Sequence, residues 1–339
     1  MKTGRYQEFS RRAHEARGLS VAQFELTFGC DLRCRHCMTD CYNKPVLLQR
    51  ELPTREVKEI LDRLKASGVL WLCLTGGDPL TRGDFPEIHE HAKKLGFIVT
   101  VFTNGCRIDR GMARLLGRMQ PFVIEITLNA ITEELYERIS GRRGSFGKVM
   151  AALELLKAEH IPIKLKTQVT RENAGEAPRI QAFARGRGIP WDASCLLYPR
   201  LNGDLGPAFL RVDPRTMPGQ GSECAAASAR ASKSSVELFP CPIKSGQGIY
   251  LDPYGFAFLC PLLRRPRYDL SRMTLARARG LAMVQAGRAR FKSESRCRSC
   301  GLKVDCPWCP GFAYLETGNR EEPVAYCCQI ARGSAQADA

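Results

Sequence analysis

The chain has 339 residues and 16 cysteines, and its 51 Lys or Arg against 35 Asp or Glu give a formal net charge of +16. A hydrophobic fraction of 44% predicts a globular chain with a large buried core, and the cysteine content excludes an ordinary cytosolic hydrolase or dehydrogenase. No apolar run is long enough to span a bilayer and the first residues are polar, so we expect a cytoplasmic protein with no membrane partner. In that reducing compartment the cysteines favour metal or redox chemistry over disulfides.

Strand-like runs alternate with amphipathic helical patterns between residues 21 and 200. The predicted strands are 22–28, 69–74, 97–102, 122–128, 161–169 and 191–197. Between the first two, Val57, Ile60, Leu61 and Leu64 have the spacing of a helix face that covers a sheet. A second helix is expected to be capped by Asp84 and to end at Gly96. This alternation predicts an α/β fold built from βα units around a parallel sheet.

The composition changes after residue 200, where Gly, Pro, Ser and Ala dominate to about residue 235. We therefore divide the chain into an N-terminal extension (1–20), a βα domain (21–200), a linker (201–235), a cysteine-rich domain (236–330) and a tail (331–339). The part from Cys224 onward holds nine of the cysteines but little aliphatic core. Such a segment is expected to fold around metal.

Cys30, Cys34 and Cys37 directly follow the first predicted strand and are separated by three and then two residues. Three thiolates on one loop can bind three irons of a four-iron cluster, and the fourth iron is left open for chemistry on a small molecule. A structural zinc loop with Cys41 as its fourth ligand is the alternative. At these residues the sequence resembles the radical S-adenosylmethionine (radical SAM) superfamily, and the resemblance extends over residues 21–328. His36 stands where relatives usually carry an aromatic residue.

The next predicted strand is followed by Thr75-Gly76-Gly77-Asp78-Pro79. Two glycines allow backbone to approach a ligand closely, and the carboxylate of Asp78 can accept from an ammonium group. The segment resembles the Gly-Gly-Glu-Pro motif of the same superfamily. That resemblance implies that Gly76, Gly77, Asp78 and Pro79 hold the amino group of S-adenosyl-L-methionine.

Further polar residues follow the later strands, whose carboxyl ends open on one face of a parallel barrel. The resemblance implies that Asn104 and Asn129 contact the ribose and sulfonium region, although many relatives carry Asp at the second position. It also implies that Arg143 binds the methionine carboxylate, and a solvated loop cation is the alternative for this residue.

The C-terminal cysteines resemble the SPASM extension of the superfamily, which binds two auxiliary iron–sulfur clusters. The resemblance implies that Cys297, Cys300, Cys306 and either Cys327 or Cys328 bind one cluster, with Cys327 as our choice, and that Cys241, Cys260, Cys309 and Cys224 bind the other. A pair of zinc knuckles is the alternative. Cys41, Cys73, Cys106 and Cys195 remain outside these sets. We interpret Cys73 as a core residue, and Cys106 and Cys195 as core or wall residues, with donation of a hydrogen atom or a proton to the active face as the alternative for these two.

The excess positive charge is concentrated in residues 261–292, which hold nine Lys or Arg and one acid, Asp269. Such a segment can attract an acidic peptide or a nucleic acid, but a solvated helix face is the simpler interpretation. No recognised RNA-binding module accompanies it, so we do not expect a nucleic-acid partner.

The fold that the resemblance implies is a partial (β/α)6 TIM-like barrel followed by a SPASM domain. The activity that it implies is reductive cleavage of S-adenosyl-L-methionine at a [4Fe-4S] cluster to a 5′-deoxyadenosyl radical, which abstracts hydrogen from a substrate. We expect a ribosomally made peptide that is crosslinked, oxidised or epimerised, an external electron donor and, where needed, a separate peptide-recognition chain. Sulfatase maturation, tetrapyrrole modification or a noncatalytic metal- or nucleic-acid-binding role are the alternatives.

Overall fold

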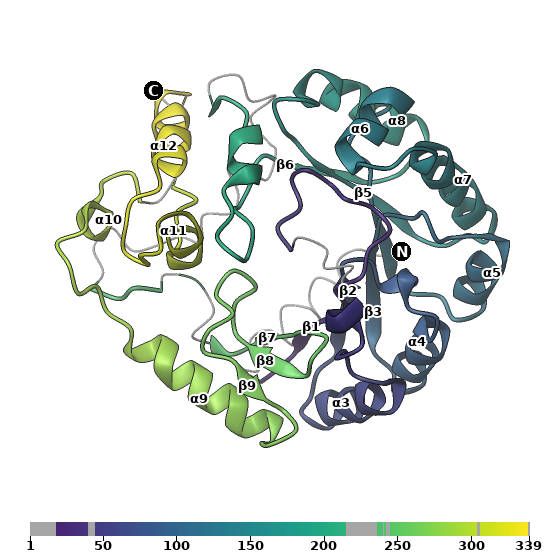
Figure 1. Cartoon of the computed structure of the whole chain (residues 1–339), viewed down its shortest axis with the longest axis horizontal. Coiled ribbons are helices and arrows are strands. Elements are labelled where there is room, and N and C mark those ends of the chain that lie inside the picture. The colour runs from purple at the N-terminus through teal and green to yellow at the C-terminus, as the bar shows by residue number, and fades with distance from the viewer. Residues whose placement is uncertain are drawn as a thin grey trace.

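The computed structural model describes residues 18–39, 45–214, 236–239, 241, 245–303 and 306–337. Six parallel strands form the barrel wall: β1 (Val21–Thr27), β2 (Trp71–Gly76), β3 (Ile98–Thr103), β4 (Val123–Thr127), β5 (Ile163–Gln168) and β6 (Trp191–Ser194). They pair in chain order, each with the next. Each predicted strand overlaps its observed counterpart, and the expected partial (β/α)6 barrel is confirmed (Figure 1).

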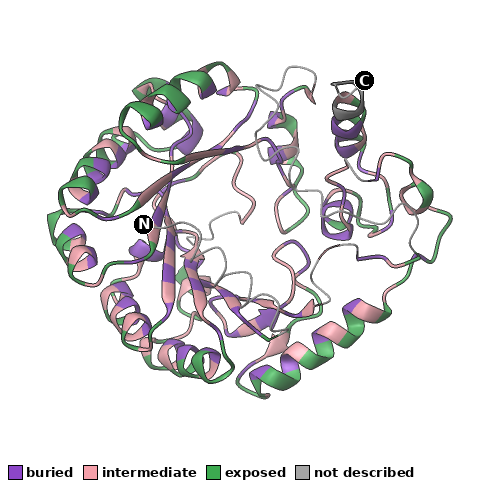
Figure 2. Ribbon diagram, turned by 180° about the vertical axis from the view of Figure 1, so that it is seen from behind, coloured by how far each residue is buried: buried purple, intermediate pink, exposed green. Residues whose placement is uncertain are grey.

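Helices cover the outer face of this wall (Figure 1). They are α3 (Thr54–Ala66), α4 (Phe85–Lys94), α5 (Arg110–Arg118), α6 (Glu133–Ser140), α7 (Ser145–Ala158) and α8 (Ala177–Gly186), and the one-turn α2 (Pro45–Leu48) precedes them. The buried residues of α3 are Val57, Ile60, Leu61 and Leu64, as their spacing predicts. Figure 2 shows the same pattern around the barrel, with buried helix faces toward the sheet and exposed faces outward.

The prediction that Asp84 caps α4 is correct in position but wrong in its hydrogen bonding. Asp84 does precede the helix, but its side chain makes no capping hydrogen bond. Its carboxylate instead accepts from Arg82, with Nε at 2.8 Å and Nη2 at 2.6 Å, and from Thr54 Oγ1 at 2.6 Å. A charge-assisted bidentate pair is stronger than a single bond to a backbone amide, so the arginine takes the carboxylate.

The sheet continues into the cysteine-rich part of the chain. β7 (Gly248–Leu251) pairs parallel to β1, and β8 (Phe256–Phe258) and β9 (Tyr268–Asp269) extend the sheet in antiparallel fashion. The barrel core also includes Ile249 and Leu251, and Leu275 from α9 (Leu275–Arg288). The sheet therefore continues across the predicted start of the cysteine-rich domain at residue 236.

A second buried core gathers around Phe312, Trp308 and Ile330, at the helices α10 (Arg296–Ser299), α11 (Pro310–Thr317) and α12 (Ala325–Ala337). Residues 331–337 continue α12, so the predicted tail at 331–339 is wrong over this stretch. The helix continues there because its inner face is anchored by apolar residues such as Ile330. Within the described part of the chain, no helix has the length and apolar character that crossing a membrane requires.

Candidate functional site

The cysteine loop leaves the carboxyl end of β1 and is tied to the end of α6. Arg33 N donates to Ser140 O at 2.8 Å and Arg35 N donates to Ile139 O at 3.1 Å. Inside the loop, Cys30 Sγ accepts from Leu32 N at 3.4 Å. These bonds fix the backbone that presents Cys30, Cys34 and Cys37.

A cavity of about 250 Å³ lies at the carboxyl ends of β1 to β4, where parallel strands of a barrel place their functional loops. Its lining brings together eight of the residues that the sequence singled out, namely Cys30, Cys34, His36, Cys37, Gly76, Gly77, Asn104 and Asn129. Asp78, Pro79 and Arg143 are not part of the lining. Phe102, Tyr136 and Ser140 also line the cavity, and no sequence signal marks them.

The two glycines after β2 serve a close approach between loops. Gly76 has φ +144°, and a Cβ there would lie 2.1 Å from Thr27 O, while a Cβ on Gly77 would lie 2.3 Å from Gly29 O. The glycine segment packs on the backbone that leads to Cys30, with Gly77 N donating to Thr27 O at 2.7 Å. The sequence predicts that the glycines allow a ligand to approach the backbone. In the structure, the group that approaches them closely is the backbone of the cysteine loop.

Asp78 lies behind the cavity and holds its loops together. Its carboxylate accepts from Asn104 N at 2.7 Å, from Thr103 Oγ1 at 2.8 Å and from Leu80 N at 2.9 Å. Burial raises the pKa of Asp78 to about 6, and these three donors partly oppose that rise. All three of these donors belong to the protein. The contact of Asp78 with a bound ammonium group stays a prediction.

Asn104 is held by Asp31, a residue that the sequence reasoning missed. Asn104 Nδ2 donates to Asp31 Oδ1 at 2.8 Å and lies 3.7 Å from Cys30 Sγ. Asp31 also pairs with Arg107 Nε at 3.1 Å, and its carbonyl accepts from Arg142 Nη1 at 2.7 Å. This network joins the loops after β1 and β3 beside the first cysteine.

Arg107 and Arg142 are the cations that contact this network through Asp31. Arg142 and Arg143 are both exposed and both lie outside the cavity lining. The contact of Arg143 with the methionine carboxylate therefore stays a prediction.

His36 and Asn129 meet across the cavity, with His36 Nε2 and Asn129 Nδ2 3.3 Å apart. Burial, and then the charge of Arg200, lower the pKa of His36 to about 4, so the imidazole is neutral. Its Nδ1 is buried and has no hydrogen-bond partner among the described residues. A buried polar atom of this kind in a cavity wall suits contact with a bound polar ligand.

The chemistry of the thiols fits an iron–sulfur cluster. Burial, and then the neighbouring thiols of Cys37 and Cys30, hold the pKa of Cys34 well above its usual value. Three thiolates here would repel one another unless a positively charged metal centre compensates them. No group of three donors among the described residues is arranged for a single metal ion. The thiolates of a cluster bind separate irons, so they need no common ion at their centre.

A second group of thiols lies in the C-terminal part of the chain. Burial, and then the neighbouring thiols of Cys328, Cys306 and Cys300, raise the pKa of Cys297 to about 12. Of the terminal pair, it is Cys328 that acts on Cys297, whereas Cys327 is fully buried and its pKa is raised by burial and then by the thiols of Cys306 and Cys309. The structure favours Cys328 over our choice of Cys327 as the fourth member of this group.

The remaining C-terminal cysteines form a third group. Burial raises the pKa of Cys309 to about 12, and the thiols of Cys260 and Cys241 contribute to the rise. The same three residues are those expected to share a cluster. Cys224, the expected fourth ligand, lies outside the described residues, as does Cys41.

Comparison with protein families identifies a match to the radical SAM superfamily model over residues 24–172. Among curated proteins, Fe-coproporphyrin III synthase of Methanosarcina barkeri is 29% identical over 50% of this chain and 42% of its own length. PqqA peptide cyclase of Gluconobacter oxydans is 32% identical over 48% and 45%, and mycofactocin maturase MftC of Mycolicibacterium smegmatis is 32% identical over 49% and 41%. The matched region therefore spans less than half the length of each of these three relatives.

Two solved structures share the fold over nearly the whole chain. Streptococcus suis SuiB bound to precursor peptide SuiA has a TM-score of 0.69 at 14% identity and covers 95% of this chain and 79% of its own. The enzyme anSMEcpe with bound AdoMet and Cp18Cys peptide has a TM-score of 0.67 at 16% identity and covers 94% and 96%. At these identities the likeness concerns the fold, and it includes the cysteine-rich C-terminal part.

Proposed function

We propose that the protein cleaves S-adenosyl-L-methionine reductively and modifies a peptide, on the premise that residues 24–172, which match the radical SAM superfamily model, act as a radical SAM domain. The observation that carries the proposal is the convergence of Cys30, Cys34 and Cys37 with the glycine segment after β2 and with Asn104 around one cavity. These elements come from separate loops, so their meeting is a property of the folded barrel.

The protein's own residues bind and shield the reactants. Cys30, Cys34 and Cys37 are the proposed cluster ligands, and Gly76, Gly77, Asn104 and Asn129 are the proposed contacts of S-adenosyl-L-methionine. Once bound, the two cofactors supply an electron and a 5′-deoxyadenosyl radical that abstracts a hydrogen atom from the substrate. Apolar wall residues, Phe102, Tyr136 and Ile139, exclude water from the site.

The C-terminal thiols are proposed to hold two auxiliary iron–sulfur clusters. The grouping of Cys297, Cys300, Cys306 and Cys328 supports one cluster, and that of Cys241, Cys260 and Cys309 supports the other. Cys224 remains the predicted fourth ligand of the second. These thiolates would hold clusters whose irons could accept an electron, which would suit an oxidation that must remove a second electron from the substrate.

A peptide is the proposed substrate class. Two of the sequence relatives are named as a peptide cyclase and a mycofactocin maturase, and SuiB is a protein with a bound precursor peptide. The name Fe-coproporphyrin III synthase makes a tetrapyrrole the second candidate. An external electron donor, a cytoplasmic location and, where needed, a separate recognition chain complete the proposal.

Anaerobic reconstitution tests the activity. With three cubanes we expect about 12 irons per chain and release of 5′-deoxyadenosine under a strong reductant. Replacing Cys30, Cys34 and Cys37 by Ala should remove about four irons and abolish that product. Cys73→Ala is the matched control, because Cys73 lies in β2 outside the thiol groups, and it should retain both iron and activity. A wild-type protein that binds zinc and releases no nucleoside contradicts the proposal.

The substrate class has its own test. The active protein is incubated with short peptides encoded beside its gene and, in parallel, with a tetrapyrrole precursor from which Fe-coproporphyrin III can be made. A mass change in a peptide supports peptide modification, whereas turnover of the tetrapyrrole alone moves the assignment to the second candidate.

A further inference from the structure

A groove of about 1,090 Å³ lies between α9 and α11, and it shares no lining residue with the cysteine cavity. We call it the α9 groove. Three of its apolar side chains are unusually exposed: Leu281 at 45%, Val284 at 51% and Tyr314 at 43%. Leu263 and Phe239 continue the apolar surface inward. An apolar hollow of this kind on a soluble protein marks a binding surface.

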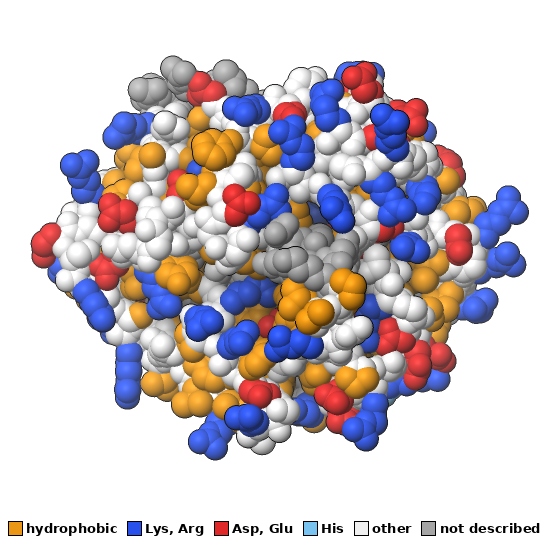
Figure 3. All heavy atoms as spheres, viewed as in Figure 1, with side chains coloured by type: hydrophobic (Ala, Val, Ile, Leu, Met, Phe, Trp, Pro, Cys, Tyr) orange, Lys and Arg blue, Asp and Glu red, His pale blue; other side chains and the backbone are white. Residues whose placement is uncertain are grey.

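The rim of the α9 groove is strongly basic. Arg265, Arg288, Arg290, Lys292 and Arg320 line it, and within the described residues none of the five forms a salt bridge. The acid on the rim is Glu321, whose carboxylate already accepts from Lys292 N at 2.9 Å and from Ser293 N at 2.8 Å. Figure 3 shows basic and apolar side chains intermixed over α9 on this face.

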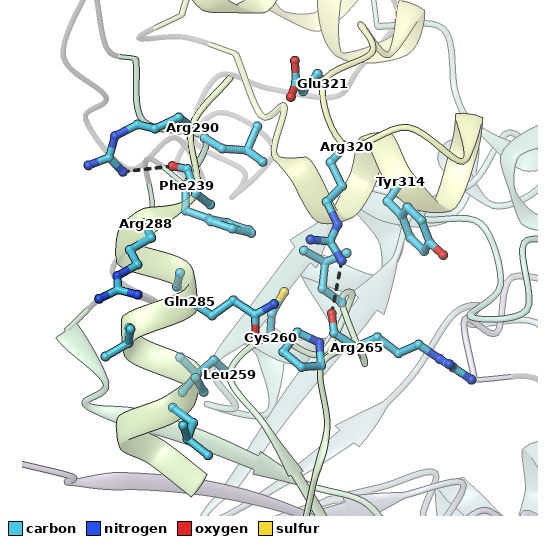
Figure 4. A pocket seen from close by; sticks show the side chains of 18 of the residues that line it. Phe239, Leu259, Cys260, Arg265, Gln285, Arg288, Arg290, Tyr314, Arg320 and Glu321 are labelled. Carbon is cyan, nitrogen blue, oxygen red and sulfur yellow. Dashed lines mark hydrogen bonds between the residues drawn. The ribbon is translucent and has the colours of Figure 1, made fainter. Parts of the chain in front are cut away.

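Several of these cations are held in place by neutral partners. Arg320 Nη2 donates to Arg265 O at 3.3 Å, and its guanidinium lies over the Tyr314 ring at 5.7 Å. Arg290 Nη1 donates to Gly287 O at 2.6 Å, at the end of α9. In Figure 4, Arg288 and Arg290 lie on the α9 side of the groove while Arg320 and Tyr314 lie across from them. Cations fixed without acidic partners favour the binding of carboxylates.

We propose that the α9 groove binds an acidic segment of the peptide substrate that also carries aliphatic side chains, outside the residues that react. This inference rests on the proposed function and adds a recognition site to it. The groove is at the upper limit of small-molecule pockets, which span about 300–1,000 Å³. Its apolar floor accommodates aliphatic side chains, and its rim complements carboxylates.

Other occupants fit the groove less well. A second copy of the chain would bring a like net charge of +16 against the basic rim. Single-stranded nucleic acid binds through bases stacked on open aromatic faces. Here two of the three exposed apolar side chains, Leu281 and Val284, are aliphatic, and one face of the Tyr314 ring lies under Arg320.

The position of the groove suits a substrate tether. Cys260, a proposed auxiliary ligand, lies in its wall, and the preceding strand β8 pairs with β7, which pairs with β1. A peptide docked here is attached to the same sheet that presents the cysteine loop. Such an attachment raises the effective concentration of the reacting residues at the cavity.

The test uses the anaerobically reconstituted full chain and fluorescein-labelled probe peptides. The main probe is a helical peptide of Glu, Leu and Ala with roughly 14 residues, or about four turns. One control peptide has Lys for Glu, another has Ser for Leu, and an oligothymidine of equal length probes nucleic acid. Fluorescence anisotropy at about 50 mM salt, where screening is weak, reports binding.

We expect the Glu and Leu peptide to bind more tightly than each control probe. The double variant Arg288→Glu/Arg290→Glu should weaken its binding by at least about tenfold. The control Arg185→Glu/Arg277→Glu changes the net charge equally, at exposed sites outside the groove, and should weaken binding less than about twofold. Leu281→Ser/Val284→Ser tests the apolar floor and should also weaken binding.

Equal binding of the Lys peptide, or equal losses in the two charge-reversal variants, overturns the proposal. Tighter binding of the oligothymidine with the same dependence on Arg288 and Arg290 overturns it in favour of nucleic acid. Release of 5′-deoxyadenosine, measured on the same samples, separates this proposal from the proposed function. The Arg288/Arg290 variant should retain that release, which shows that it is folded. A wild-type protein that releases 5′-deoxyadenosine but binds no peptide refutes the groove alone.

Discussion

The buried ion pair between Glu25 and Arg264 joins the C-terminal part of the chain to the strand that leads into the cysteine loop. Arg264 Nη1 and Nη2 donate to the two oxygens of Glu25, each at 2.6 Å, and the side chains are only 19% and 7% exposed. The guanidinium also lies over the rings of Phe258, at 4.9 Å, and Phe28, at 5.6 Å. A bidentate pair buried among aromatic rings has little access to water when one partner is removed.

Arg264→Met keeps the aliphatic stem and removes the charge, so Glu25 is left buried without its partner. Removing one member of a buried pair costs about 3–5 kcal/mol, and loss of the contacts with the rings adds to that cost. Asp252, whose pKa burial raises to about 6, keeps its hydrogen bonds from Tyr254 N and Phe256 N but loses the nearby positive charge of Arg264. We expect the free energy of unfolding to fall by at least about 3 kcal/mol and the melting temperature by at least roughly 6 °C.

Denaturant unfolding followed by circular dichroism measures this change, and a double-mutant cycle isolates the pair. Glu25→Leu alone should also be costly, but Glu25→Leu/Arg264→Met should cost clearly less than the sum of the single changes. The control is Arg272→Met, because Arg272 pairs with Asp269 at 3.5 Å and is 84% exposed, and its loss should cost less than about 0.5 kcal/mol. Additive single changes, or an Arg264→Met cost as small as that of Arg272→Met, would refute the reasoning.

Three further predictions concern the cysteine sites. Gly77→Ala places a Cβ 2.3 Å from a backbone oxygen of the cysteine loop, so it should destabilise the fold by about 1–3 kcal/mol and lower the iron content, while Gly83→Ala, with open space around it, should do neither. The pKa of Asp78 is about 6 in the folded chain against 3.8 in the unfolded chain, so the folded state binds more protons between these two pH values. The free energy of unfolding therefore falls as pH rises from about 4 to 6. Asp78→Asn should flatten that part of a plot of melting temperature against pH. Cys328→Ala should remove about four irons and Cys327→Ala should not, which metal analysis and electron paramagnetic resonance decide.

The barrel could be predicted from sequence because its signals are local. Apolar stripes such as Val57 to Leu64 fix which face of a helix is buried, and the three-cysteine spacing lies within eight residues of chain. The carboxyl-end rule for parallel strands then brought Asn104 and Asn129 to the same cavity as the cysteines. Periodicity and topology together were sufficient for these placements.

The network around Asp31 could not be predicted in this way. Its partners Asn104 and Arg142 lie 73 and 111 residues along the chain, and they reach Asp31 because the folded barrel brings the loops after β1, β3 and α6 together. A lone acid between two cysteines has no periodic pattern that marks it. Side-chain networks across strand ends depend on register and rotamers, which composition does not encode.

The choice between Cys327 and Cys328 could not be made from sequence because helix α12, which contains both, was not predicted. Adjacent residues on a helix point about 100° apart, so only one of two neighbouring cysteines can face a given partner. Both cysteines were placed in the cysteine-rich domain (236–330) with no helix assigned to them, so either thiol could turn toward Cys297. In α12, the fully buried Cys327 packs into the second core and Cys328 lies toward Cys297. We therefore expect helix register to determine the fourth ligand of the proposed cluster, and apolar residues such as Ile330 set that register by packing into the core.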